Sequence, residues 1–457
     1  MATPLAQWLP SSFVQRIGLG GQYSADAARM VIAIIAYLGL VALAPDAGST
    51  VAVVAFVALA LLHDRDAWIA PSPGIDRLTL TSMVFVAAAL VSTLLHPVGV
   101  SGLWALGKFA LIPVTIWSLR VTRRYELGPA LWLGATAGAV AAGTVALLQV
   151  AFTDVWRPAA LTNPILFGDL ALTLGLVAVA TRPLADRIAS RSRTIASVAA
   201  VSLAVVASVL TQSRGSWIAG PALLVVLALQ YRDSLSPRSA TAFGLVIAFA
   251  ITFAAVSHSG APVRYLENGV GDTMAYIVGP RDLEVRSTSI GARFEMWRSA
   301  AGGFRSEPIF GIGWGNLRDR FNADVDAGVR VPRIAQYNHA HNQFISSTAS
   351  GGVVGLAALL ALFGVPAWMF FRALLDRDPQ IVALGAAGLI VVVGFALFGL
   401  TEAILETASP AVFFASTVAL LVGQLDRTGV GRDDPAPSDR PVPTSRPRWD
   451  RRPLHPE

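Results

Sequence analysis

The chain has 457 residues, of which 54% are hydrophobic and only 14% are charged, whereas about a quarter of the residues in a soluble globular protein are charged. Its mean hydropathy is +0.59, and this composition indicates an integral membrane protein. All but one of its 35 basic residues are arginine, and most lie in short loops rather than on one basic face, which excludes a nucleic-acid-binding protein. The absence of cysteine excludes disulfides, thiol catalysis and cysteine-ligated metal centres.

Twelve apolar segments are candidates for membrane-spanning helices, which need about 17 to 25 residues. They lie near residues 27–44, 49–63, 78–95, 99–117, 129–151, 164–181, 194–211, 215–230, 239–256, 343–371, 379–400 and 407–424. The second and the eighth are short for a span. Ala42-Leu43-Ala44 resembles a signal-peptide cleavage pattern, but Pro45 would follow the cut, so we interpret the first segment as a retained anchor.

The arginines of the short loops predict the orientation. One set of short loops holds fifteen arginines, whereas the opposite set holds only Arg157 and Arg214. Because arginine-rich loops stay in the cytoplasm, we expect both termini there and the long loop after the ninth segment on the outer side. The chain then divides into a membrane domain at 1–256, an outer loop with short helices at 257–342, the last three spans at 343–424 and a disordered cytoplasmic tail at 425–457.

The outer loop contains ten arginines and a predicted helix at about residues 291–305. At 100° per residue, Arg293 shares an apolar face with Trp297, whereas Glu295 and Arg298 fall on the other face, where solvent is expected. An arginine on an apolar face needs a partner. Arg293 is therefore a candidate binding residue.

A second loop helix is predicted from Asn316, as its N-cap, to about Gly328. It carries Asp324 and Asp326, a spacing that resembles the Asp-x-Asp of metal-dependent glycosyltransferases. On a helix, however, two such carboxylates point about 200° apart. We therefore expect a solvated face here and no metal site.

His339 and His341, at the end of the outer loop, are candidate catalytic residues. An imidazole with a pKa of about 6.5 can act as a general base, although a purely structural role at the start of a helix also fits. A metal site with His258 as a third ligand is a weaker alternative, because no metal-binding spacing supports it. Glu402 and Glu406, in the outer turn between the last two spans, are expected to assist the histidines or to hold an arginine.

Three further polar residues lie at or within the spans. Arg214 sits among small residues between two spans that leave almost no loop, and it either extends to the lipid headgroups or binds phosphate through its bidentate fork. Lys108 and Asp169 fall inside predicted spans, where charge is costly. They are expected to pair with each other or to form the proton relay of a transporter.

Several stretches, in order, resemble the O-antigen ligase and O-antigen polymerase superfamily. They are Arg293-Phe294-Glu295-Met296-Trp297, the stretch from Pro308 to Asn316, and Asn338-His339-Ala340-His341-Asn342-Gln343-Phe344. The last continues into a ligase-type pattern of His341, Asn342, Gly352 and Gly355, and Thr211 to Trp217 resembles the Ser-Arg-Gly element of the family. Arg157, followed eleven positions later by Gly168, has a spacing noted in O-antigen polymerases, which decides nothing alone. The resemblance covers roughly residues 150 to 365.

The resemblance implies an all-α polytopic glycosyltransferase of the GT-C type, with about twelve transmembrane helices and its active site at the periplasmic face of the bacterial inner membrane. Such an O-antigen ligase moves polysaccharide from undecaprenyl diphosphate to lipid A-core with inversion, without a nucleotide, a metal or another cofactor. His341, or else His339, would take the acceptor proton. Arg214 and Arg293, assisted by Arg157, would bind the donor diphosphate.

Two alternatives stay open. A polymerase of the same superfamily differs in its acceptor, and the histidine-glycine pattern favours the ligase. A transporter of lipid-linked sugars would use Lys108 and Asp169, but the unusual charged residues collect at the outer rim rather than deep in the spans.

Overall fold

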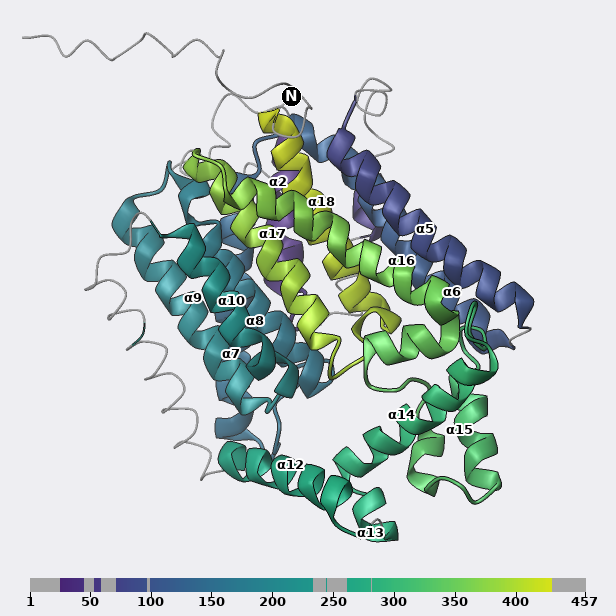
Figure 1. The fold of residues 1–457 in the computed structure, drawn as a ribbon. Helices are drawn as coiled ribbons and strands as arrows, with labels where there is room; N and C mark the ends of the chain where they lie inside the picture. Colours follow the sequence, from purple (N-terminus) through teal and green to yellow (C-terminus); the bar gives the residue numbers. More distant parts are fainter. Residues whose placement is uncertain are drawn as a thin grey trace, which may run out of the picture.

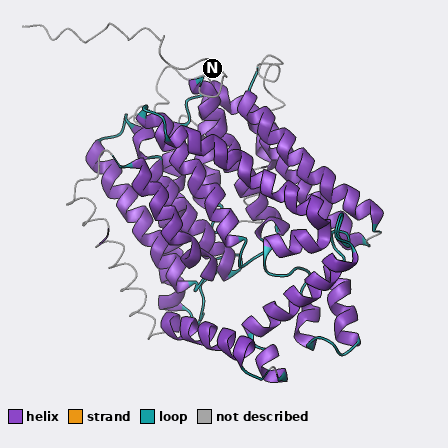
Figure 2. Ribbon diagram, viewed as in Figure 1, coloured by secondary structure: helices purple, strands orange, loops and turns teal. Residues whose placement is uncertain are grey.

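The computed structural model describes residues 25–44, 53–58, 71–96, 99–232, 244, 261–280 and 282–429, and all regular structure within them is helical (Figure 2). The apolar helices are α2 (Ala25–Leu40), α5 (Pro73–Leu95), α6 (Val100–Ser118), α7 (Gly128–Phe152), α8 (Pro164–Ala180), α9 (Ser190–Leu210), α10 (Arg214–Gln230), α16 (Gln343–Leu374), α17 (Pro379–Phe398) and α18 (Ala408–Thr428). The loop before α16 forms α12 (Ala261–Val278), α13 (Leu283–Arg286), α14 (Ser289–Ser306) and α15 (Leu317–Asp326). Short 3₁₀ turns are η2 (Leu119–Arg124), η3 (Arg182–Ala185), η4 (Pro332–Gln336) and η5 (Ile404–Glu406).

The chain is a polytopic helical membrane protein. Among the described residues, seven helices are long and apolar enough to cross a membrane, and α2, α8 and α10 are shorter apolar helices. These ten helices coincide with ten of the predicted segments. The second predicted segment lies mostly, and the ninth almost entirely, outside the described residues. On α5, Leu80, Met83 and Leu94 are 65%, 55% and 71% exposed, which provides apolar surface for lipid.

The apolar helices form one bundle (Figure 1). α7, α8 and α9 pack against one another with α2 against α7, while α16 packs against α5 and α17, and α18 against α6. α17 joins the two groups through α8 and α10. Because α17 and α18 lie inside the bundle, their side chains are buried on nearly all sides. α12 to α15 lie at the opposite end of the bundle from the last turn of α18 (Figure 1).

A break in α16 anchors the loop that precedes this helix to the bundle of apolar helices. Gly352 has a left-handed φ of 63°, which interrupts the helix. The loop fills the break with four backbone hydrogen bonds of 2.9 to 3.2 Å, from Val353 to Pro308, Val354 to Ile309, Ile312 to Ala349 and Gly313 to Ser350. A Cβ at Gly352 would lie 2.2 Å from the Ile309 carbonyl oxygen, so no side chain fits there.

The predicted loop helices are present, with corrections. α14 spans the first, but its N-cap is Thr288, whose Oγ1 accepts from Gly291 N at 3.0 Å. α15 follows Asn316 as predicted, but that side chain does not cap it and instead donates to the Ile312 carbonyl at 2.8 Å. The prediction of a solvated Asp324 is wrong, because it is 8% exposed and accepts a hydrogen bond of 2.6 Å from Ser299.

Two further findings differ from the sequence analysis. Glu295, expected on the solvated face of its helix, is fully buried, since α12 and the segment after α15 cover that face. α12 itself, over residues 261–278, was not predicted as a separate helix. Its polar composition hides it from a search for apolar segments.

Candidate active site

His339, His341 and Glu402 meet where the loop before α16 touches the turn between α17 and α18. His341 Nδ1 lies 2.9 Å from Glu402 Oε2, and His339 Nε2 lies 3.5 Å from Glu402 Oε1. The centroids of the two imidazole rings are 4.5 Å apart, and the ring of Tyr337 contacts His341 edge-on. The side chains are 18%, 18% and 12% exposed, so the pairing is shielded from bulk water. Glu402 therefore contacts both histidines, and its assistance to them in a reaction stays a prediction.

The start of α16 fixes this arrangement. Asn342 caps the helix by accepting from Ile345 N at 3.0 Å, and its Nδ2 donates to the Leu400 carbonyl at 3.0 Å. The next residue, Gln343, donates its N–H to the Gly399 carbonyl at 2.7 Å and accepts from Leu405 N at 2.8 Å. These bonds fasten the helix start to the turn that carries the carboxylate.

His341 is held in a strained backbone conformation. Its φ is 46°, and only two other described residues that are not glycine, Ala160 and Gln212, have positive φ. Such conformations cost of order 1–3 kcal/mol and cluster at functional sites, where the surrounding structure enforces them. The conformation therefore supports a functional role for this histidine.

Electrostatics gives different protonation states to the members of the trio, the name used here for His339, His341 and Glu402. Burial lowers the pKa of His339 to about 4. The positive charges of His341, Arg293 and Lys108 lower this pKa further, whereas the negative charge of Glu402 raises it. His339 is therefore neutral at neutral pH. Burial alone would raise the pKa of Glu402, but the hydrogen bond from His341 and the nearby positive charges hold it below its usual value. The carboxylate is therefore ionised. Since the charge of Arg293 acts on both His339 and Glu402, its guanidinium lies near the trio.

The turn that carries Arg214 adjoins the turn that carries Glu402. Arg214 is the first residue of α10, and Ser213 and Ser216 donate to Asp169 Oδ1 at 2.7 and 2.6 Å. A Cβ on Gly215 would lie 2.9 Å from Thr401 Oγ1, and Thr401 precedes Glu402 in the chain. The guanidinium of Arg214 packs against α12. A Cβ added at Gly269 would lie 2.9 Å from Arg214 Nη2.

Arg157 and Gly168 both act on this same turn. Arg157 Nε donates to the Thr211 carbonyl at 2.7 Å, and its Nη2 reaches the Gln212 carbonyl at 3.5 Å. A Cβ on Gly168 would lie 2.2 Å from Thr211 Oγ1. The spacing that carried no weight in the sequence therefore has a physical basis, because both residues shape the turn that presents Arg214.

The predicted pairing of Lys108 with Asp169 is wrong. Asp169 accepts its hydrogen bonds from the serines of the Arg214 turn, and Lys108 instead lines a cavity of about 140 Å³ together with Glu406, Trp314 and Asn338. Burial raises the pKa of Glu406 to about 8, although Lys108 opposes this. The charge pair on which the transporter hypothesis relied is not formed.

The trio is also the one group of described side chains with metal-ligand geometry. One ligand atom from each of His339, His341 and Glu402 lies within 4.8 Å of the others. Two imidazoles and a carboxylate are a donor set that suits zinc. The predicted third ligand, His258, lies outside the described residues. The expectation that no metal takes part stays a prediction, which a chelator tests.

Comparison with known proteins bears on the family. A family model described as O-antigen ligase matches residues 199–360, a region that contains Arg214, Arg293 and both histidines but not Glu402. A protein of Haemophilus influenzae, named as an uncharacterized protein, is 22% identical over 284 residues, covering 62% of this chain and 70% of its own. The match confirms the resemblance to the O-antigen ligase superfamily, whose members are glycosyltransferase-like enzymes acting on lipid-linked polysaccharides.

Proposed function

We propose that the protein is an O-antigen ligase, a GT-C-type glycosyltransferase of the bacterial inner membrane with both termini in the cytoplasm. It transfers polysaccharide from undecaprenyl diphosphate to a sugar of lipid A-core at the periplasmic face. The spans number about twelve and the outer loop covers residues 257–342. The observation that carries the proposal is the contact of 2.9 Å between His341 and Glu402.

The His341–Glu402 pair is suited to general base catalysis. Glu402 engages Nδ1 of His341, which leaves Nε2 to take the proton from the acceptor hydroxyl. The carboxylate then stabilises the imidazolium that forms, as a carboxylate does behind other catalytic histidines. His339, neutral and beside the same carboxylate, is assigned a positioning role.

The arginines are suited to the leaving group. As the acceptor oxygen attacks the anomeric carbon, the bond from that carbon to the phosphate oxygen breaks and its electron pair goes to the diphosphate, with inversion. Arg214 and Arg293 offer planar forks that match phosphate oxygens, and the N-terminus of α10 adds positive potential beside Arg214. Arg157 supports the reaction by holding the carbonyls of the Arg214 turn.

The test combines a defined reaction with three variants. Purified protein is incubated with lipid-linked polymer and lipid A-core, and the product is identified as capped core or as a longer polymer. Capped core is expected, whereas a longer polymer would establish the polymerase instead. Arg214→Ala, Arg293→Ala and His341→Ala are each expected to abolish capping while lipid-linked polymer accumulates, and wild-type capping by all three would overturn the site assignment.

A further inference from the structure

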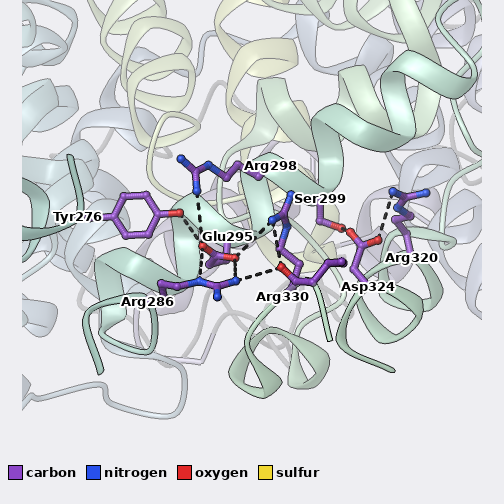
Figure 3. Close-up of polar contacts among 9 residues, drawn as sticks. Tyr276, Arg286, Glu295, Arg298, Ser299, Arg320, Asp324 and Arg330 are labelled. Carbon is purple, nitrogen blue, oxygen red and sulfur yellow. Dashed lines mark hydrogen bonds and ion pairs between the residues drawn. The ribbon is translucent and has the colours of Figure 1, made fainter. Parts of the chain in front are cut away.

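A cluster of arginines surrounds one buried carboxylate in the outer loop (Figure 3). Glu295 accepts two hydrogen bonds from Arg286, at 3.0 and 2.9 Å, and one from the Tyr276 hydroxyl at 2.7 Å. Arg298 and Arg330 each lie 3.8 Å from it. Arg286 alone neutralises the carboxylate, so the charges of the other two arginines are in excess.

The two outer arginines keep donors for another partner. At 3.8 Å their contacts with Glu295 are too long for hydrogen bonds. Arg330 donates one bond, from Nη1 to the Val329 carbonyl at 3.2 Å, and its side chain stays 24% exposed. Arg298 is oriented by the ring of Tyr276, whose centroid lies 5.2 Å from its guanidinium carbon. Both guanidinium groups are thus held in place before any ligand arrives.

Two of these arginines, Arg298 and Arg330, line a groove along α14. One part, with about 350 Å³ of space, is lined by Arg298, Ala301, Arg305 and Arg330. It shares Arg298 and Ala301 with a second part lined by Tyr276, Ile277, Phe294 and Trp297. Trp297 donates to the Ala340 carbonyl at 2.8 Å, and Ala340 lies between the two histidines in the chain. The groove therefore joins an aromatic part, whose Trp297 bonds the backbone between the two histidines, to an arginine-lined part.

We propose that this arginine groove, defined by Arg298, Arg305 and Arg330, binds phosphate groups on the sugar chain of the acceptor. Arginine forks match phosphate oxygens in a planar, bidentate arrangement. The donor diphosphate is already assigned to Arg214 and Arg293, and an inverting attack requires the acceptor to approach from the side opposite the leaving diphosphate. The identity of the acceptor as lipid A-core rests on the proposed function.

Binding without transfer tests the inference independently of the reaction. The probe is water-soluble core oligosaccharide released from lipid A, before and after chemical removal of its phosphates. It is titrated onto the full chain in nanodiscs of phosphatidylcholine. The variant Arg298→Gln/Arg305→Gln leaves the Arg286–Glu295 pair intact, and Arg377→Gln/Arg427→Gln removes two exposed arginines at the other end of the bundle.

The groove variant is expected to bind the phosphorylated oligosaccharide at least about tenfold more weakly than wild type, with a smaller dependence on salt. The control variant and wild type are expected to bind it equally. Removal of the phosphates is expected to abolish the difference. Equal affinity of the groove variant and wild type for the phosphorylated probe, or undiminished wild-type affinity for the dephosphorylated probe, would overturn the inference.

A transfer assay distinguishes binding of the acceptor from binding of a lipid headgroup. It also distinguishes failure of this inference from failure of the proposed function. In phosphatidylcholine nanodiscs the groove variant is expected to raise the KM for lipid A-core and to leave the KM for the donor unchanged. A defect that appears only when phosphatidylglycerol is added would assign the groove to a headgroup and refute the acceptor role. Phosphate-dependent binding by a protein that caps no core would refute the ligase while the anion site stands.

Discussion

The substitution Glu402→Gln tests the mechanism most directly. Glutamine keeps the size of the side chain but removes the charge that faces His341 at 2.9 Å. A hydrogen bond to a charged group contributes about 1.5–3 kcal/mol, and if this contribution is felt mainly when the imidazolium forms, kcat falls roughly 10- to 150-fold, since 1.36 kcal/mol is tenfold in rate. We expect the KM for the donor to change little, because the arginines are untouched.

The assay is single-turnover capping of lipid A-core, with intrinsic tryptophan fluorescence to follow thermal unfolding. Glu307→Gln is the matched control, because Glu307 also faces a histidine, His96 at 3.4 Å, but is 50% exposed. It is expected to retain activity within about twofold, as exposed ion pairs contribute little. A folded Glu402→Gln protein with more than half of the wild-type kcat would refute the assigned role of the carboxylate.

Three other outcomes are expected. Gly352→Ala should lower the unfolding temperature, because the added Cβ would lie 2.2 Å from the Ile309 carbonyl oxygen and φ is 63°. The control Gly364→Ala, in the same helix but with open space around it, should be neutral or stabilising. Equal effects of the two substitutions would contradict the anchoring role. The raised pKa of Glu406, about 8, means that its stabilising contribution is present below pH 4.5 and is lost as the pH rises through 8. The unfolding temperature of Glu406→Gln, relative to that of wild type, should therefore increase from pH 5 to pH 9. A difference that stays constant with pH would argue against the shift. Capping should persist in EDTA, and loss of capping that a divalent ion restores would make His339, His341 and Glu402 metal ligands.

The candidate site was only partly predictable. Arg214, Arg293 and the histidines stood out because charge beside apolar segments is costly and therefore informative. Glu402 was noted, but its contact with His341 depends on two helix ends 61 residues apart meeting through Asn342 and Gln343. No local pattern encodes such a meeting.

What the sequence determined by itself is the membrane class, the positions of ten described apolar helices and the superfamily, since these follow from local composition and short ordered motifs. Only the tertiary structure decided which charges are buried and paired. Glu295 and Asp324 are buried because neighbouring segments cover their helices, and Arg157 holds a turn because that turn comes within 2.7 Å. The physical reason is that the cost of burying a charge, and the partner that offsets it, are set by residues distant in the chain.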